Sequence, residues 1–458
     1  MESLMRRLTR GIPVLIVAVL VSACTGPSPS PTGAAVTSSP SGQSQTLTSE
    51  PITLRILRYQ ATKAEEALHT DWIAEFTKEH PNIKIEAEVV PFGELSTKIQ
   101  ASVAGGSPPD IFFIDGPNTK TYAYLKILRP LDEYLPPGFK ADIVDATLQE
   151  QSYQGQLYSM PDRQTAPALF YNTDMLDAIG VKPPTKLAEA WTWDEALKVW
   201  MQLKKKFPDV WPLEPSRFGA GGAGFYYRDG VFPRSAGDPS APVSSSLYKT
   251  YAAMSPDGTT VQGYIDSPEA ITAMKWFQDL TIVHEVTSKV GIPNAFLDKK
   301  AAMTIDHEGI IGRMVTQYPN GGFNLGVTPM PYFKTRVVMT GSNAAGISAR
   351  STHPAEAAAF LNLVFNDRNR LRYWEANRNM PARKSLFDML PAYKEFPQSM
   401  FKEQLLTIGV PRPSTPAWAA FDSIINAAIK NISLGAPVEA TLRKAAVDVD
   451  KELAKYPK

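Results

Sequence analysis

The stretch from Ser107 to Asn118, S-P-P-D-I-F-F-I-D-G-P-N, decides the fold of this chain. Ile111 to Ile114 form an apolar run that is too short for a helix, and two prolines precede it. Such a run is typical of a strand that helices cover on both faces of a parallel sheet. Ligands of open α/β sheets bind beside the carboxyl ends of their strands. We therefore predict that Asp115 and Asn118, which follow the run, line a ligand cleft; the alternative is that they only hydrogen-bond their own turn.

The segments before this stretch complete a repeating pattern. Alternating apolar and polar residues predict strands at 52–57 and 83–89, and helical periodicity predicts helices at 64–79 and 93–104. Strand, helix, strand, helix, strand is a right-handed βαβαβ unit by the rules of chain connection. Tyr59 and Gln60 follow the first strand of this unit and are expected at the same sheet edge as Asp115.

Length and composition limit the classes of function. A chain of 458 residues exceeds the size at which single hydrophobic cores stop growing, so two lobes are expected. A formal net charge of +1 gives no reason to expect nucleic acid as a partner. The five histidines are scattered, and no H-E-x-x-H motif or Cys/His cluster occurs in the sequence. We predict no catalytic residue, metal or cofactor, and a protein that is not an enzyme.

The amino terminus has the features of a targeting segment. Three arginines within the first ten residues precede an apolar segment at 11–21, which is shorter than a usual membrane span. Leu20-Val21-Ser22-Ala23-Cys24 then resembles a bacterial lipobox, in which Cys24 is lipidated. We predict a lipoprotein signal peptide at 1–23, a disordered Ser/Thr/Pro-rich tether at 24–50, and an extracytoplasmic protein anchored by lipid to the cell membrane. The alternative is an ordinary secretory signal and an incidental thiol.

Motifs along most of residues 51–420 resemble the extracellular solute-binding proteins of carbohydrate ABC importers, a group that includes maltose-binding and glycerol-phosphate-binding proteins. The motifs are F-x-x-E-H-P-N-I-K-I-E, the opening stretch with K-I-Q-A-S-V-A-G-G before it, L-D-E-Y-L, G-Q-L-Y-S-M-P, L-F-Y-N-T-D-M-L, T-W-D-E, A-A-M-T-I, A-G-I-S and H-P-A-E-A-A. The resemblance implies a periplasmic-binding-protein-like fold: two α/β lobes with mixed sheets, joined by a three-crossing hinge, with the ligand cleft between them. It places the N-terminal lobe at 51–163 plus 344–366 and the C-terminal lobe at 164–343 plus 367–458.

The resemblance also implies a set of ligand-binding residues. They are Tyr59, Gln60, Asp115, Asn118, Arg163, Gln164, Thr165, Phe225, Tyr226, Asp306, His307, Asn343 and Trp418. Many relatives have a tryptophan for stacking after A-M-T-I, whereas this chain has Gly309 nearby, so Phe225, Tyr226 and Trp418 are the candidate stacking residues. The segment 219–224 matches G-x-G-x-x-G, but no strand precedes it and no helix start follows. We therefore expect a flexible loop rather than a nucleotide site.

Aromatic rings that cover the apolar faces of a pyranose, with polar side chains around its hydroxyl rim, suit a carbohydrate ligand. The resemblance implies a monomer that captures a sugar or oligosaccharide by hinge closure and delivers it to the transmembrane subunits of an ABC permease. Its only contact with lipid would be the anchor. One alternative is another solute on the same scaffold: a phosphorylated polyol, a polyamine or an iron chelate, the last favoured by Tyr226-Tyr227. A secreted hydrolase is the other alternative.

Overall fold

The computed structural model describes residues 46–215, 225–317 and 322–456 of the chain. The predicted signal peptide, Cys24, nearly all of the tether and the glycine-containing segment 219–224 lie outside the described residues. Residues Leu47–Lys458 form one compact unit, and the description below concerns this unit.

The opening stretch forms the third strand of a parallel βαβαβ unit, as predicted. Its strands are β1 (Ile52–Tyr59), β2 (Ile83–Val90) and β3 (Ile111–Asp115), and its helices are α2 (Lys63–Glu79) and α3 (Leu95–Ala104). β1 lies between β2 and β3 and is parallel to both. The four residues from Ile111 to Ile114 are all buried, which is the burial expected of a strand covered on both faces.

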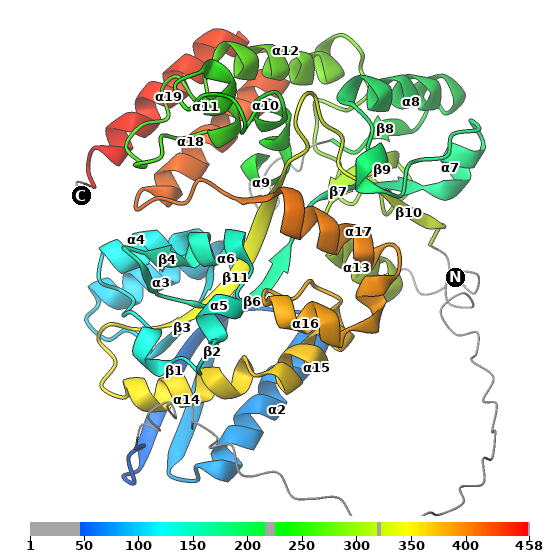
Figure 1. Cartoon of the computed structure of the whole chain (residues 1–458). Coiled ribbons are helices and arrows are strands. Elements are labelled where there is room, and N and C mark those ends of the chain that lie inside the picture. The colour runs from blue at the N-terminus through cyan, green and yellow to red at the C-terminus, as the bar shows by residue number, and fades with distance from the viewer. Residues whose placement is uncertain (1–45, 216–224, 318–321, 457–458) are drawn as a thin grey trace, which may run out of the picture. The chain divides into compact units, whose positions relative to one another are not determined.

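Strand β11 (Val338–Ile347) extends this sheet on the other side of β3. Its second half pairs antiparallel with β3 and with β6 (Met160–Thr165), and its first half pairs parallel with β12 (Gly409–Pro411). The sheet therefore has six strands in the order β12-β11-β3-β1-β2, with β6 beside β11. Figure 1 shows β11 in yellow, running from one group of helices toward the other.

A second sheet forms the centre of the other group of elements. Its order is β10 (Leu325–Thr328), β7 (Ala168–Asn172), β9 (Ala301–Asp306) and β8 (Trp211–Leu213). Four long helices contribute to its core: α8 (Trp193–Lys206), α12 (Pro268–Ile282), α18 (Trp418–Ser433) and α19 (Val438–Leu453). α8 begins at a capping box in which the Thr192 hydroxyl and the Glu195 carboxylate each accept from the other residue's backbone amide.

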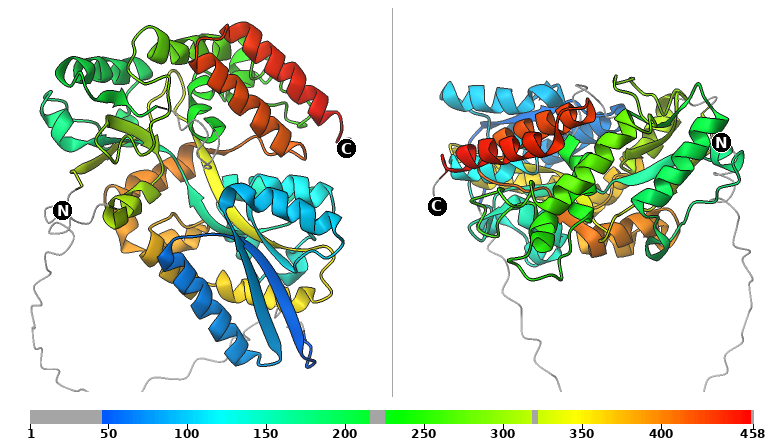
Figure 2. Two further views of the ribbon diagram at one scale, coloured as in Figure 1. Left: turned by 180° about the vertical axis from the view of Figure 1, so that it is seen from behind. Right: turned by 90° about the horizontal axis from the view of Figure 1, so that it is seen from above.

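Shorter elements connect these parts. They are α4 (Asn118–Tyr124), α5 (Phe139–Asp142), α6 (Asp145–Gln151), β4 (Ser152–Tyr153), β5 (Gln156–Leu157), α7 (Thr173–Asp177), α9 (Phe225–Asp229), α10 (Val231–Ser235), α11 (Ser246–Ala252), α13 (Gly309–Gln317), α14 (Pro354–Val364), α15 (Asp367–Asn377), α16 (Lys384–Met389) and α17 (Gln398–Glu403). The further views in Figure 2 show the two groups of elements from behind and from above.

The chain passes between two hydrophobic cores three times. One core has the side chains of β1 and β3 at its centre and the other those of β7 and β9. Apart from Val144, which belongs to the second core although its neighbours in the sequence belong to the first, core membership changes between Met160 and Ala166, between Met339 and Ala344, and between Tyr373 and Trp374. This arrangement is the predicted class, two α/β parts with mixed sheets and three connections. The lobe boundaries at 163, 343 and 366 stay predictions.

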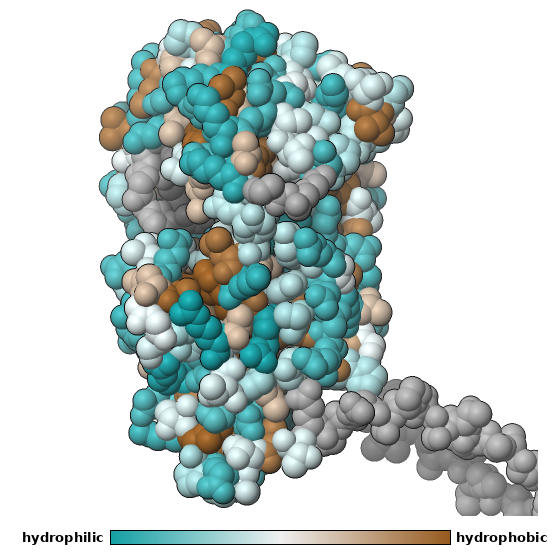
Figure 3. Space-filling model, turned by 90° about the vertical axis from the view of Figure 1, so that its left-hand side faces the viewer, coloured by the Kyte–Doolittle hydropathy of each residue, from teal (hydrophilic) through white to brown (hydrophobic). Residues whose placement is uncertain are grey.

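On the face shown in Figure 3 most residues are hydrophilic, with a group of hydrophobic residues at about mid-height. Within the described residues, no helix combines the length and the apolar character that a membrane span requires.

Candidate functional site

Three of the predicted site residues lie in one row across neighbouring strands. In the antiparallel register Asn343 of β11 is opposite Asp115 of β3 on one side and opposite Arg163 of β6 on the other. Directly opposite residues of paired strands place their side chains on the same face of the sheet, about 5 Å apart. Because β11 shifts register between Asn343 and Ala344, this row lies at an irregularity of the strand, which is a frequent feature beside binding sites.

Asn343, at the centre of the row, has an unsatisfied donor. Its side-chain Nδ2 atom is buried and has no hydrogen-bond partner among the residues that the structure describes. A buried amide N–H without a partner costs about 1 to 3 kcal/mol, and such groups are rare in native proteins. This unsatisfied donor lies between a carboxylate and a guanidinium, where an acceptor atom of a bound molecule can satisfy it.

Asp115 is bound on one side by an arginine that sequence reasoning did not identify. Arg412 follows β12, and its Nη1 and Nη2 atoms donate to the two carboxylate oxygens of Asp115 at 3.1 and 2.9 Å. The guanidinium carbon of Arg412 lies 5.6 Å from the ring centroid of Trp418 and 5.9 Å from that of Tyr227. The arginine is buried, so this bidentate pair contributes to the order of the site.

A second carboxylate faces the same arginine. Arg412 Nε donates to Glu150 Oε1 at 3.3 Å, and the Ser342 hydroxyl donates to Glu150 Oε2. Burial raises the pKa of Glu150 to about 7, although Arg412 and the Ser342 hydroxyl oppose the increase. A side chain at Gly116 would collide with Ser342, and its Cβ would lie 2.6 Å from Glu150 Oε2, so this position of the turn requires glycine.

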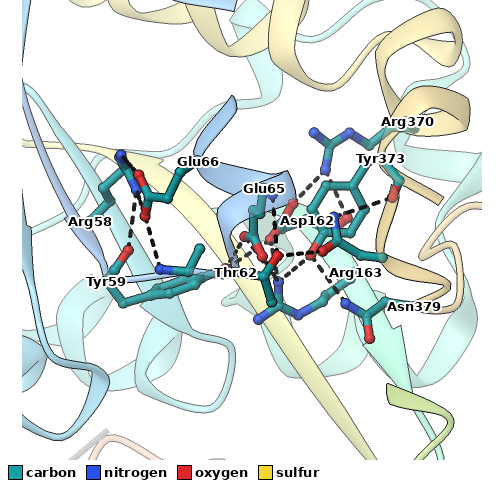
Figure 4. Close-up of polar contacts among 12 residues, drawn as sticks. Arg58, Tyr59, Thr62, Glu65, Glu66, Asp162, Arg163, Arg370, Tyr373 and Asn379 are labelled. Carbon is teal, nitrogen blue, oxygen red and sulfur yellow. Dashed lines mark hydrogen bonds and ion pairs between the residues drawn. The ribbon is translucent and has the colours of Figure 1, made fainter. Parts of the chain in front are cut away.

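The other end of the row continues into a buried polar cluster, shown in Figure 4. Arg163 donates to Glu65 Oε1 at 3.2 Å and to the Tyr373 hydroxyl, and its guanidinium carbon is 5.4 Å from the ring centroid of Tyr59. The Tyr59 hydroxyl donates to Asp162 Oδ2 at 3.0 Å. Burial raises the pKa of Glu65, against the effect of Arg163. Tyr59 is itself buried, so its ring contacts Arg163 within the protein interior.

Gln164 and Thr165 directly follow Arg163 on β6, at the end of the row opposite Asp115, and Thr165 contacts Tyr227 of α9. Gln164 is fully buried, and its backbone amide donates to the carbonyl of Met380 at 2.9 Å. The Thr165 hydroxyl is 2.8 Å from the Tyr227 hydroxyl and donates to the carbonyl of Gly341 at 2.9 Å. Burial raises the pKa of Tyr227. The Thr165 hydroxyl therefore already has hydrogen-bond partners on β11 and α9.

Asp306 and His307 occupy a separate position at the end of β9. Asp306 accepts from the backbone amide of His307 at 2.9 Å and forms an ion pair with Arg313. The adjacent Glu308 is buried, and its Oε1 atom accepts from the backbone amide of Met380 at 3.0 Å. Burial raises the pKa of Glu308 to about 8. Across the described ranges no group of three or more His, Cys, Asp and Glu side chains is arranged to hold a metal.

The remaining predicted residues differ in accessibility. Gln60 is exposed, and Asn118 is half-buried as the first residue of α4. Trp418 is buried, with one ring face stacked on Phe421 at a centroid distance of 5.6 Å. The side chains of Phe225 and Tyr226, at the start of α9, lie outside what the structure describes. Of the aromatic candidates only Trp418 is described, and its ring contacts Phe421 and the guanidinium of Arg412.

Sequence reasoning missed residues that bind the predicted ones or the immediate partners of the predicted ones. They are Glu65, Glu150, Tyr227, Arg370, Tyr373 and Arg412. A partial signal existed for two of them, because Arg412 lies between two prolines and Tyr227 directly follows a predicted site residue. The others are helical residues whose patterns are those of ordinary surface or core positions, so only their spatial neighbours identify them.

Comparisons with known proteins agree with the motifs. The profile of a family described as bacterial extracellular solute-binding protein matches residues 61–370. The galactooligosaccharide-binding protein of Bacillus subtilis (strain 168) is 23% identical over 373 residues, which are 80% of this chain and 81% of that protein.

Solved structures of the same fold include two with ligands. The GacH receptor of Streptomyces glaucescens, determined unliganded and in complex with acarbose, has a TM-score of 0.70 at 21% identity and covers 89% of this chain and 100% of its own. An ABC transporter solute-binding protein from Thermotoga lettingae, bound with α-D-tagatose, has a TM-score of 0.73 at 21% identity, covering 88% and 99%. These similarities show the fold.

Proposed function

Because this chain belongs to the bacterial extracellular solute-binding protein family, as its motifs predicted, we propose that its solute is a sugar or oligosaccharide. In this proposal the chain captures the sugar at the row of Asp115, Asn343 and Arg163 and delivers it unchanged to the transmembrane subunits of an ABC importer. Relatives named for galactooligosaccharide and arabinooligosaccharide binding, and neighbours solved with acarbose and tagatose, support the class of ligand.

The unsatisfied Nδ2 donor of Asn343 is the observation that carries the site. It lies in a row with a carboxylate that accepts hydrogen bonds and a guanidinium that donates them. A sugar hydroxyl can accept from the amide and donate to the carboxylate at the same time, because each hydroxyl is both donor and acceptor. One edge of a pyranose would therefore satisfy the row.

The charge of the row favours a neutral solute over a phosphorylated one. Arg412 is paired with Asp115 and Glu150, and Arg163 is paired with Glu65. A phosphate group would have to compete with these carboxylates for both arginines and would be repelled by them, whereas a neutral hydroxyl can donate to a carboxylate oxygen and carries no charge for it to repel.

We expect the Asn343→Ala substitution to weaken sugar binding without loss of stability. Within the described residues the Asn343 Nδ2 atom donates no hydrogen bond, so its removal costs the folded protein no hydrogen bond from this donor. Loss of one ligand hydrogen bond is worth about 1 kcal/mol, or roughly fivefold in the dissociation constant. The wild-type protein is first screened by thermal shift against a panel of sugars, and the affinities of both proteins for the best ligand are then measured by calorimetry.

Asn362→Ala is the matched control. Asn362 also has an unpartnered amide atom, its Oδ1, but its Nδ2 donates to the carbonyl of Tyr134 at 3.0 Å, away from the row. This variant should keep the wild-type affinity. Equal affinities of wild type and Asn343→Ala would remove Asn343 from the site, and the absence of any bound sugar would count against the proposed ligand class.

We further propose that the chain is a monomer that lies outside the cytoplasmic membrane, anchored through a lipid on Cys24, and that it has no enzymatic activity. The lipobox-like sequence before Cys24 supports the anchor, as does a relative from Streptomyces antibioticus that is named as a lipoprotein and is 25% identical over 166 residues. Two or more acyl chains give stable anchoring, whereas one chain binds reversibly.

Replacement of Cys24 by serine should release the protein from membranes. A serine hydroxyl cannot form the thioether bond of the lipid, so the variant should be recovered in the soluble fraction after cell disruption and ultracentrifugation. Ala23→Gly, which keeps a small residue before Cys24, serves as the control that stays with the membranes. Sedimentation of the Cys24→Ser variant with the membranes would contradict the anchor.

A further inference from the structure

Arg412 occupies groups that the proposed function assigns to a sugar, the Asp115 carboxylate and the Trp418 ring. Its guanidinium donates two parallel hydrogen bonds to Asp115 and lies over the Trp418 ring, and a pyranose in that place would donate two neighbouring hydroxyls and stack an apolar face. We propose that Arg412 is an internal occupant of the binding site, which a sugar must displace from Asp115 before the sugar can bind. This inference rests on the proposed function.

The position of Arg412 helps to explain why Trp418, the candidate stacking residue, is buried. Trp418 is 4% exposed, and both the stacked Phe421 ring and the Arg412 guanidinium lie against its ring, each at 5.6 Å from the Trp418 centroid. Phe421 belongs to the hydrophobic core, whereas Arg412 is a charged side chain on the segment between β12 and α18. Of the two covers, the arginine is the one whose departure leaves the core intact.

The displaced arginine has a second carboxylate to remain with. Its Nε atom already donates to Glu150 Oε1 at 3.3 Å, while the two Nη atoms hold Asp115. A guanidinium has five donors, so it can leave Asp115 and keep Glu150 without becoming an unpaired buried charge. Asp422 of α18 provides further negative potential near the arginine.

The exchange also selects the ligand. Release of Asp115 leaves a carboxylate that must regain two donors, and release of Trp418 leaves an apolar face that must be covered again. A neutral sugar ring with two adjacent free hydroxyls supplies both, whereas an anion would be repelled by Asp115 and an open-chain polyol offers no ring face. Arg412 thus acts as a specificity-determining residue for neutral cyclic sugars.

The experiment compares the affinity of wild type and of the Arg412→Gln variant for the sugar that binds best in the panel. If the arginine occupies the site in most molecules, its removal raises the fraction that is competent to bind, and the dissociation constant should fall on the order of tenfold. Arg443→Gln is the control, because Arg443 forms an exposed ion pair with Glu439 on α19 and its loss changes the net charge equally. That variant should bind like the wild type.

A glutamine at 412 leaves Glu150 without its arginine, so the double variant Arg412→Gln/Glu150→Gln is measured as well. It removes the uncompensated carboxylate and should show the same tighter binding. Weaker or unchanged binding in a folded variant would overturn the inference, since it would mean that Arg412 contacts the bound sugar or does not compete with it. If the wild type binds no sugar, the proposed function and this inference both fail. If the wild type binds a sugar and Arg412→Gln does not bind it more tightly, only this inference fails.

Discussion

Replacing Arg370 with methionine is expected to lower the free energy of unfolding by about 3 to 5 kcal/mol, the typical effect of breaking a buried ion pair from one side. Arg370 and Asp162 are both nearly inaccessible to solvent, and Nη1 of Arg370 donates to the carboxylate and, at 3.1 Å, to the backbone carbonyl of Asp162. Figure 4 shows this pair beside Arg163 and Tyr373.

Methionine keeps the apolar contacts of the arginine stem but not its charge. The Arg370 guanidinium carbon lies 4.8 to 4.9 Å from the ring centroids of Trp72, Phe365 and Tyr373, a volume that a methionine can largely fill. The cost therefore comes from Asp162. Burial acts to raise the pKa of Asp162, but Arg370 and then Arg163 outweigh it and lower the pKa, so the carboxylate depends on Arg370 for its charge.

Arg368→Met is the control for this substitution. Arg368 lies two residues away on the same helix and pairs with Glu75, but its side chain is 60% exposed, so its loss should cost less than about 1 kcal/mol. Both variants are unfolded with denaturant and compared with the wild type at pH 7. Equal stabilities of the two variants would show that the Asp162 pair contributes no more than a surface pair.

Stability should decrease as the pH rises from about 5 to about 8, and Glu308 should account for a large part of the decrease. Burial raises the pKa of Glu308 from the ordinary 4.5 to about 8, so between these values the folded state holds a proton that the unfolded state has lost. Folding then takes up a proton, and each pH unit lowers the free energy of unfolding by about 1.4 kcal/mol. The stabilising contribution of Glu308 is fully present below pH 4.5, and it is lost as the pH rises through about 8, the pKa of Glu308 in the folded protein.

Glu308→Gln removes this titration while keeping the shape of the side chain. The amide oxygen can still accept from the backbone amide of Met380, which now binds Glu308 Oε1 at 3.0 Å. At pH 8 to 9 the variant should be more stable than the wild type by on the order of a few kcal/mol, and at pH 4.5 the two should be similar. Thermal unfolding across this pH range tests the expectation.

Burial also raises the pKa values of Glu150 and Asp422, to about 7 and about 6, so the wild-type profile contains more than one titration in the same direction. The comparison is therefore made as the difference between wild type and variant at each pH. Glu285→Gln, at an exposed carboxylate paired with Lys204, is the control that should follow the wild type. If the stability of the Glu308→Gln variant has the same pH dependence as that of the wild type, Glu308 is not protonated in the folded protein.

Local patterns were sufficient for the first part of the fold. The apolar run at Ile111–Ile114 and the alternation before it determine a parallel βαβαβ unit, because strand period and helix period differ and each is visible within a few residues. The motifs determined the family, and the resemblance predicted Asp115, Asn343 and Arg163 as site residues. That these three form one row depends on the register of β11, which pairs residues more than 170 positions apart in the sequence.

The partners of the row were decided by the tertiary structure alone. Arg412 binds Asp115, which is 297 positions away in the sequence. The Nδ2 donor of Asn343 has no acceptor among the described residues, and this too depends on which side chains the fold brings next to it. Burial and charge pairing depend on which surfaces come together, and no local pattern encodes the distance between two side chains. The sequence alone therefore determined the family and the class of fold, whereas the contacts of Asp115 with Arg412 and of Arg163 with Glu65 followed only from packing.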